Sequence, residues 1–456
     1  MKRNLSALIA LLSLVSLVLA GCGGTQTPAT QPTAVPPATT AAPSAAPPAA
    51  TAAASATTPA APATTGSKAM IIGYTASLTG KSNLESTRQK NGLQLWMDQM
   101  NANGGAVVGS DKITFTAKSY DDESNNARVQ ELYTRLINED KADFLISPYG
   151  SGPADAAAVL AEQYGKIMIT TGAASDSTYS KGYTLVYQVY TPASRYLTGA
   201  LDELAKQDPT AKKIVVVHEN DKFSTDVANA LKTYAEEKGY TIALFEGYDT
   251  TTTDFAPIIN KIQQAAPDAI FGGGHFPDGN TFAKQLFEKK VATKYLALLV
   301  APPEPKFAEL GDAAFGVVGP SQWEPLAAFT PEIAKAVGVE WYGPTGPEFV
   351  SAYTTAFGEE PSYHAAGGYI AGLILQRAIE KAGSTANDAV KAAMDSMDVL
   401  TFFGHIKFRT DAAAHGLQVG HDMVYIQWQK GADGKLVKQV TWPLEGKTAD
   451  LIYPIR

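Results

Sequence analysis

The sequence predicts an α/β protein made of two doubly wound lobes, each with a mostly parallel sheet, and a cleft between them. Three observations lead to this fold class. The 389 residues of 68–456 are enough for large buried cores. Short apolar runs alternate there with segments of helical periodicity, which is the pattern of repeated βα units. The alternation then starts again farther along the chain, which indicates a second lobe.

The N-terminus has the parts of a lipoprotein signal. Its basic start is followed by residues 5–19, an almost wholly apolar stretch that is too short to span a membrane and remain there. This stretch ends in Leu19-Ala20-Gly21-Cys22, which resembles a bacterial lipobox. We expect residues 1–21 to be a signal peptide and Cys22 to carry the lipid that anchors the chain. The alternative is an ordinary secretory signal with an incidental cysteine.

Residues 22–67 have the composition of a spacer. They consist almost entirely of Ala, Thr, Pro and Gly, with nine prolines and no charged side chain. Such a segment cannot bury enough apolar surface to offset the entropy of ordering it. Its prolines favour extended conformations, so we expect a disordered, semi-rigid linker of up to about 140 Å.

Composition excludes several classes of protein. The formal net charge is −8 and the sequence has no basic run, which argues against a nucleic-acid partner. Cys22 is the single cysteine, so a disulfide framework and a multi-cysteine metal site are excluded. No later segment has 18 uninterrupted apolar residues, so the lipid would be the sole membrane attachment.

The first series of βα units begins with an apolar strand at 70–74 and a turn at 75–80. A helix follows, with Leu93, Trp96 and Met97 on its buried face, and ends at 103–105. The next expected elements are a strand at 113–117, a helix at 127–138, a strand at 142–146, a helix opened by Pro153 and a strand at 166–170. Residues 183–189 are expected to form a connecting strand.

The second series is expected to begin with a helix at 196–205 and a central strand at 214–218. Further elements are helices at 225–238, 255–265 and 282–290, and strands at 240–245, 269–271 and 295–300. Residues 321–325 are expected to form a crossing from the second lobe back to the first. Helices at 348–357 and 364–382 would then belong to the first lobe. Residues 402–442 are expected to form a closing hairpin with a turn at 431–434. The lobes would comprise 68–191 plus 326–405, and 192–325 plus 406–456.

Ligands of open α/β sheets bind beside the loops that follow the strands. In the first lobe these loops are 74–79, 147–152 and 170–175, which are rich in hydroxyl groups and glycine. Such loops at helix N-termini suit a carboxylate. In the second lobe the loops are 219–223, 272–278 and 302–304, whose aromatic and acidic residues suit an apolar body and an amine.

Several segments together resemble a known family. They are the lipobox, the spacer, residues 73–80 (Gly-Tyr-Thr-Ala-Ser-Leu-Thr-Gly) and residues 170–175 (Thr-Thr-Gly-Ala-Ala-Ser). With 311–314, 361–366 and 401–404, they make residues 68–456 similar to the leucine/isoleucine/valine-binding lipoproteins of ABC transporters, which have the type I periplasmic binding fold. The resemblance implies an extracytoplasmic protein that captures a small amino-acid-like solute by hinge closure and delivers it to a permease. We expect a monomer.

The resemblance also implies where the solute binds. The family's turns after the third and fourth strands, which bind the ligand's carboxylate and ammonium, correspond to 149–151 and 172–174. Ala174 stands where amino-acid-binding members tend to have Thr, and Phe223 where they usually have Tyr. Asp278 and Glu304 are candidates for the acidic partner of an ammonium group. The candidate ligand-binding residues are Tyr74, Ser77, Tyr149, Gly150, Ser151, Gly172, Ala173, Ala174, Ser175, Phe223, His275, Phe276, Asp278, Glu304 and Trp323.

The departures from the family at Ala174 and Phe223 weaken the case for leucine, isoleucine or valine as the ligand. Tyr149, Phe276 and Trp323 suggest a larger or flatter ligand, so the candidates are a branched-chain amino acid, an amide or an aromatic acid. Simple packing is the alternative role for each of these three side chains, and exposure on the surface is the alternative for Glu304.

Other functions are less well supported. Ser151 lacks the flanking glycines of a hydrolase nucleophile elbow, so a hydrolase is a remote alternative. The glycines at 272–274 do not complete a dinucleotide motif, and we expect no cofactor. His275 with Asp278 alone is a poor metal site, and the remaining histidines are assigned no role. A sensor subunit that signals to a membrane receptor remains open as an alternative to a transport protein.

Overall fold

The structure is a computed structural model that describes residues 67–327 and 329–455. The predicted signal peptide, Cys22 and all but the last residue of the predicted linker lie outside the described residues. In the described part of the chain, no helix combines the length and apolar character needed to cross a bilayer.

The first lobe contains a six-stranded sheet with the strand order β2-β3-β1-β4-β5-β6. All its strand pairs are parallel except β2 with β3. Its elements are β1 (Ser67–Ala76), α1 (Asn83–Ala102), β2 (Ala106–Val108), β3 (Asp111–Asp121), α2 (Asn126–Asn138), β4 (Phe144–Ile146), α3 (Ser151–Gln163), β5 (Met168–Thr170), α4 (Asp176–Tyr179) and β6 (Val186–Gln188). The predicted connecting strand is therefore the edge strand β6, because it pairs with β5.

The second lobe contains a seven-stranded sheet with the order β16-β15-β11-β10-β9-β7-β8. Strands β7 to β11 are parallel, and β15 is antiparallel to both β11 and β16. Its elements are α5 (Thr198–Gln207), β7 (Lys213–Glu219), α6 (Lys222–Glu237), β8 (Thr241–Tyr248), α7 (Ala256–Ala265), β9 (Ala269–Gly273), α8 (Phe276–Glu288), β10 (Tyr295–Leu298), β11 (Val318–Ser321), β15 (Val424–Lys430) and β16 (Leu436–Trp442). Short 3₁₀ segments cover Ala193–Arg195, Pro305–Ala313 and Leu444–Gly446.

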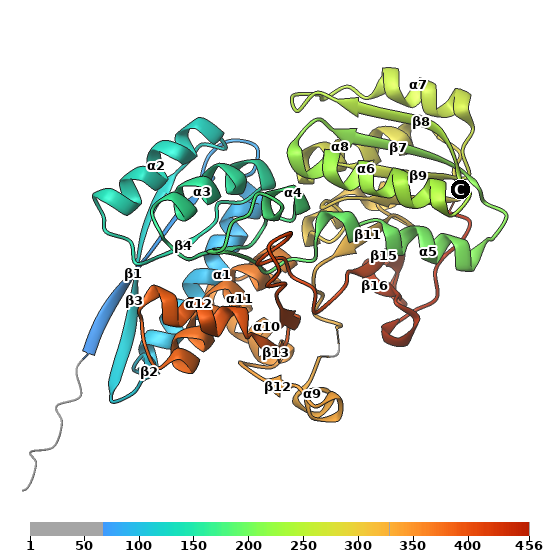
Figure 1. Cartoon of the computed structure of the whole chain (residues 1–456). Helices are drawn as coiled ribbons and strands as arrows, with labels where there is room; N and C mark the ends of the chain where they lie inside the picture. Colours follow the sequence, from blue (N-terminus) through green and yellow to red (C-terminus); the bar gives the residue numbers. More distant parts are fainter. Residues whose placement is uncertain (1–66, 328, 456) are drawn as a thin grey trace, which may run out of the picture. The chain divides into compact units, whose positions relative to one another are not determined.

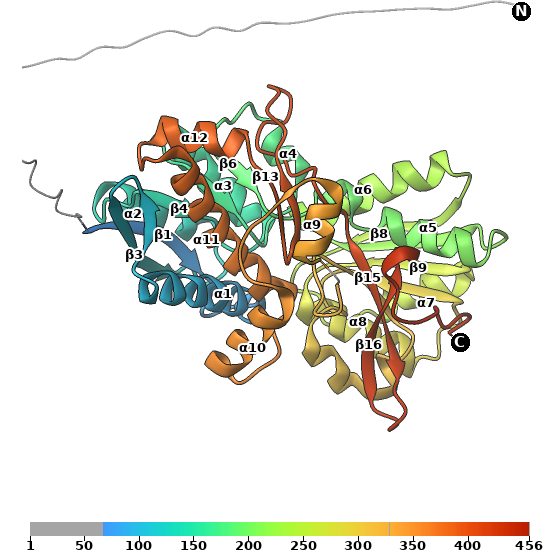
Figure 2. The ribbon, with the colours of Figure 1, turned by 90° about the horizontal axis from the view of Figure 1, so that it is seen from below.

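The C-terminal part of the chain contributes to both lobes. Between β11 and β15 the chain forms α9 (Pro331–Val337), β12 (Glu340–Trp341), α10 (Gly346–Phe357), α11 (Tyr363–Ala382), α12 (Asn387–Asp395), β13 (Asp398–Thr401) and β14 (Gly404–Lys407). Strands β12, β13 and β14 form a separate three-stranded sheet. In Figure 2, α11 lies against α1 of the first lobe, whereas the β15–β16 hairpin belongs to the second.

The predicted hairpin at 402–442 is wrong in its first half. Phe402 and Gly404 lie at the turn of the β13–β14 hairpin, and only β15 and β16 form the closing hairpin around the predicted turn. Gly404 has a φ of 136°, a conformation that favours glycine, and this allows the chain to turn between β13 and β14. Phe402 is then buried against Trp323 and Phe349.

Each large sheet is buried on both faces, as a doubly wound fold requires. In β4, Phe144 and Ile146 belong to the core shared with α1 and α11, whereas Leu145 belongs to the core shared with α2 and α3. In β9, Phe271 belongs to the core shared with α5 and α6, whereas Ile270 belongs to the core shared with α7 and α8. Figure 1 shows the two sheets in separate parts of the ribbon.

Helices α6 and α8 begin earlier than predicted, and both changes matter for the site. Helix α6 begins at Lys222 because Asp221 caps it by accepting a hydrogen bond from the Ser224 backbone N–H at 2.7 Å. Helix α8 begins at Phe276 because the Asp278 carboxylate accepts the backbone N–H of His275 at 2.8 Å. These caps place Asp221 and His275 at the carboxyl ends of β7 and β9.

Candidate functional site

Two adjoining cavities lie where the loops of the two sheets meet. The outer cavity has a volume of about 550 Å³ and is lined by Ser77, Lys81, Ser82, Ser124, Asn125, Asn126, Ala127, Tyr149, Gly150, Gly152, Pro153, Asn220, Asp221, Lys222, Thr250 and His275. The inner cavity has a volume of about 10 Å³ and is lined by Tyr149, Gly150, Gly172, Ala174, Tyr190, Tyr196, Phe223, His275, Val300, Tyr363 and His364. Tyr149, Gly150 and His275 belong to both walls.

The outer cavity receives the N-terminal ends of several helices. Asn125 caps α2 by accepting the backbone N–H groups of Ala127 and Arg128 at 2.9 and 3.2 Å. Helices α3 and α6 also begin at this wall, and Lys81 and Lys222 add two ammonium groups. Helix N-termini and lysines favour negative charge, so this wall suits an anionic group of a solute.

The inner cavity has aromatic walls. Tyr196 and Phe223 meet edge to face with ring centroids 5.0 Å apart, and Tyr190 meets Tyr363 at 5.7 Å. Tyr149 lies edge to face against His364 at 5.2 Å. Flat apolar faces of this kind suit an aliphatic or aromatic body.

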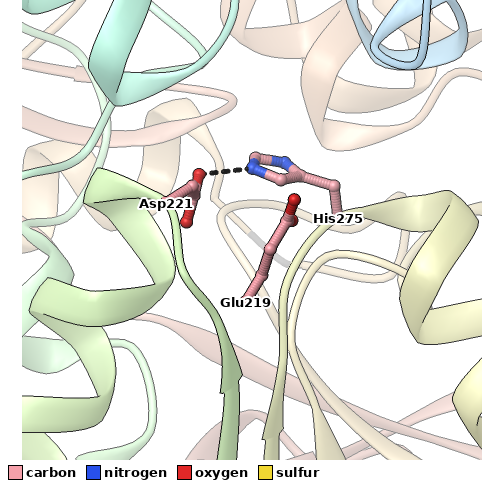
Figure 3. A group of neighbouring side chains, drawn as sticks. All are labelled: Glu219, Asp221 and His275. Carbon is pink, nitrogen blue, oxygen red and sulfur yellow. Dashed lines mark hydrogen bonds and ion pairs between the residues drawn. The ribbon is translucent and has the colours of Figure 1, made fainter. Parts of the chain in front are cut away.

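His275 connects the two lobes at the boundary between the cavities. The Tyr149 hydroxyl lies 2.8 Å from His275 Nδ1, and Asp221 Oδ2 lies 2.8 Å from Nε2. Figure 3 shows His275 beside Asp221, with the Glu219 carboxylate directed toward the same space. Glu219 also accepts a hydrogen bond from the Lys81 ammonium, which comes from the first lobe. Charged and polar contacts therefore join the opposing walls.

The charges around His275 decide its protonation. Burial would lower the pKa of His275, but Asp221, Glu219 and Glu85 together raise it to about 9. Burial would raise the pKa of Asp221, and His275 instead lowers it to about 2. Burial raises the pKa of Glu219. At neutral pH we therefore expect an imidazolium ion paired with the Asp221 carboxylate.

A second ionic cluster lies deeper between the lobes. Glu304, fully buried after β10, accepts hydrogen bonds from Arg88 of α1 and from His364 Nδ1 of α11, the latter at 2.6 Å. Arg88 also binds Glu359 at 2.9 Å. Burial would raise the pKa of Glu304, but His364 and Arg88 lower it to about 2. Glu304 is thus ionised and fully paired.

The structure brings seven of the predicted site residues to the cavity walls: Ser77, Tyr149, Gly150, Gly172, Ala174, Phe223 and His275. The Ser151 hydroxyl lies behind the wall, where it accepts the backbone N–H groups of Ala174 and Ser175 at 3.0 and 3.2 Å. Ala173 is buried beside them.

The other predicted residues lie farther from the cavities. Phe276 donates its backbone N–H to Glu85 at 3.0 Å, and Asp278 accepts the Tyr248 hydroxyl. Glu304 reaches the inner wall only through His364. Tyr74 is buried in β1, and Trp323 packs edge to face against Phe349 and Phe402, both at 5.5 Å. Neither Tyr74 nor Trp323 lines the outer or the inner cavity.

Several site residues were missed from the sequence. Glu85 and Arg88 lie on the same helical face as the buried Leu93, and charged residues on an apolar face were the available signal. Glu219 and Asp221 fell inside a predicted loop but were not singled out. His364 was assigned no role, although it follows the helix boundary at Ser362.

Comparisons with known proteins agree with this architecture. A sequence profile of the family described as periplasmic binding protein matches residues 70–435. A Brucella melitensis biotype 1 protein named Leu/Ile/Val-binding protein homolog 7 is 26% identical over 354 residues, which are 76% of this chain and 85% of the relative.

Two solved structures illustrate the likeness of fold. A branched-chain amino acid transporter substrate binding protein from Streptococcus pneumoniae, in complex with isoleucine, has a TM-score of 0.66 and 20% identity and covers 85% of this chain and 100% of its own. A solute binding protein of an ABC transporter from Rhodopseudomonas palustris BisB5, in complex with 3,4-dihydroxy benzoic acid, has a TM-score of 0.67 and 22% identity, with coverages of 85% and 98%. The predicted class, two doubly wound lobes with a cleft, is confirmed.

Proposed function

The chain belongs to the periplasmic binding protein family, and on that premise we propose that it is the extracytoplasmic substrate-binding lipoprotein of an ABC importer. Its solute would be a branched-chain amino acid, an amide or an aromatic acid. The lobes would comprise residues 68–191 plus 326–405, and 192–325 plus 406–456. The protein would capture and deliver the solute to a permease without catalysing a reaction, and Cys22 would carry its lipid anchor.

One observation carries the proposal: residues from opposite lobes form the walls of the same cavities. Tyr149, Gly172 and Ala174 come from the first lobe, whereas Phe223 and His275 come from the second. The aromatic inner wall suits the body of the solute, and the helix N-termini at the outer wall suit its carboxylate. The solutes in the two solved structures described above, isoleucine and 3,4-dihydroxy benzoic acid, each carry a carboxylate on an aliphatic or aromatic body.

The size of the inner cavity supports a hinge mechanism. A volume of about 10 Å³ holds about one water molecule, which is far too little for isoleucine or an aromatic acid. We infer that the lobes separate before a solute enters between Tyr149 and Phe223. A solute that touches both walls would then select the closed form.

Thermal unfolding with a panel of solutes tests the function. The full-length protein, refolded to remove any carried solute, is heated with leucine, isoleucine, valine, benzoate, 3,4-dihydroxybenzoate or short amides. We expect at least one of them to raise the melting temperature, because a ligand at 100 times its Kd stabilises the folded state by about 2.7 kcal/mol. Small-angle scattering with the same solute should show compaction. An unchanged melting temperature across the panel would contradict this solute class.

The anchor is tested separately. We expect Cys22→Ser to move the protein from the membrane fraction to the soluble fraction, because serine has no thiol for the diacylglycerol. Immunoblots of fractionated cells measure the distribution. A variant that stays in the membrane fraction would contradict the lipid anchor at this residue.

A further inference from the structure

Three potential metal ligands meet at the boundary of the outer cavity. Glu219 ends β7, Asp221 caps α6 and His275 precedes α8, and one ligand atom from each lies within 4.8 Å of the others. Figure 3 shows them converging on the same space. Asp221 and His275 line the outer cavity, so the group is accessible from the cleft.

A buried oxygen in this group has no hydrogen-bond partner. Glu219 is 1% exposed; its Oε1 accepts from Lys81, but its Oε2 is buried and unpaired. The fully buried Glu85 shows the same pattern, because its Oε1 binds the backbone N–H of Phe276, beside His275, and its Oε2 is unpaired. A buried carboxylate oxygen without a partner costs free energy, which a bound cation would recover.

Neighbouring groups hold the ligands in an orientation suited to a metal. His275 directs Nε2 toward Asp221 while the Tyr149 hydroxyl lies 2.8 Å from Nδ1. Asp221 Oδ1 accepts the Ser224 backbone N–H at 2.7 Å, which leaves Oδ2 facing the imidazole. Metal-binding histidines and carboxylates are usually fixed by hydrogen bonds of this kind.

Glycine at position 274 permits this crowding. A Cβ at Gly274 would lie 2.5 Å from Glu219 Oε2 and 2.7 Å from Asp278 Oδ2. Any larger residue would therefore push Glu219 away from His275. The position of the Glu219 carboxylate beside Asp278 and His275 therefore depends on this glycine.

We propose that Glu219, Asp221 and His275 bind a divalent first-row transition-metal ion at the mouth of the solute cleft. One imidazole nitrogen and two carboxylate oxygens are ligands that Zn²⁺ accepts, with a fourth position open toward the outer cavity. An oxygen of the solute could occupy that position. Ca²⁺ requires six to eight oxygen ligands, and Mg²⁺ prefers octahedral oxygen sites, so neither fits.

A cation of the chain occupies the same place. The Lys81 ammonium binds Glu219, and the His275 imidazole pairs with Asp221. A metal ion must displace the Lys81 ammonium from Glu219. Removing the lysine charge should therefore strengthen metal binding, whereas losing a ligand should weaken it.

Calorimetric titration of the chelator-treated full-length protein with ZnCl₂ tests the proposal. We expect saturable binding of one ion per chain at this site, with the affinity lowered about 100-fold or more in His275→Ala and in Glu219→Gln. Lys81→Met should raise the affinity about tenfold. The control is His405→Ala, which removes an imidazole that pairs with Asp398 at 2.6 Å and lines neither cavity, so it should leave the titration unchanged.

Each alternative result is informative. Wild-type protein without saturable Zn²⁺ binding, or His275→Ala with the wild-type affinity, would overturn the proposal. If His275→Ala does not fold, Glu219→Gln and the expected gain in Lys81→Met still decide the question. The solute panel repeated in EDTA separates the two proposals: solute binding without Zn²⁺ binding would overturn the metal site alone.

Discussion

Replacing Glu304 by Gln is expected to lower the free energy of unfolding by about 3 kcal/mol, the lower end of the cost of breaking a buried ion pair. The amide keeps one acceptor but removes the charge that balances Arg88, whose side chain is only 3% exposed. His364 loses the same charged partner. Urea denaturation of the wild type and of Glu304→Gln measures the difference.

An exposed ion pair provides the matched control. Asp411 binds Arg409 through two hydrogen bonds of 2.8 and 2.9 Å at the surface. Exposed pairs contribute little, so Asp411→Asn should leave the denaturation curve unchanged. A Glu304→Gln curve that coincides with the wild-type curve would contradict the role assigned to the buried cluster.

The difference in unfolding free energy between the wild type and Glu304→Gln should depend on pH. The pKa of Glu304 is lowered from its ordinary value of 4.5 to about 2, so folding favours the charged form. The stabilisation is therefore complete above pH 4.5 and is lost as the pH falls toward 2. The control is Glu304→Gln, in which Arg88 and His364 have lost the carboxylate and the amide does not titrate. The stability difference between the two proteins should shrink through this interval.

The order of elements could be predicted because the physical signals are local. A parallel strand such as β7 is a continuous apolar run, and a helix such as α1 repeats its apolar residues at helical spacing. Pairing is not local, and here prediction failed. The alternation through 402–442 does not say that β14 pairs with β13 while β15 pairs with β11.

The site could be predicted only as a set of loops. The rule that ligands bind after parallel strands led to Tyr149 and His275, because both follow strands directly. It could not find Arg88 or His364, since they come from helices that pack against the cleft. The same rule also led to Trp323, but this side chain packs against Phe349 and Phe402. Position after a strand indicates a loop near the cleft but does not tell which way a side chain points.

Tyr149 is the residue for which we expect the largest effect on solute binding. Its ring lines both cavities and its hydroxyl joins His275 of the opposite lobe. Tyr149→Ala should weaken the binding of the panel solute that stabilises the wild type by about 30-fold or more, since burying an aromatic side chain contributes about 2 kcal/mol. Tyr149→Phe keeps the ring and loses only the hydrogen bond, so we expect about fivefold.

Calorimetric titration measures both variants against a surface control. Tyr164 follows α3 in the same lobe and is 39% exposed, so Tyr164→Ala should bind the solute as the wild type does. The relative loss of affinity in Tyr149→Ala and Tyr149→Phe distinguishes two roles of Tyr149, which are contact of its ring with the solute and contact of its hydroxyl with His275. Equal losses in Tyr149→Ala and Tyr149→Phe would mean that the contact with His275 holds the lobes together and that the ring does not touch the solute. Wild-type affinity in Tyr149→Ala would remove this residue from the site and, with it, the main reason to expect a flat or aromatic ligand.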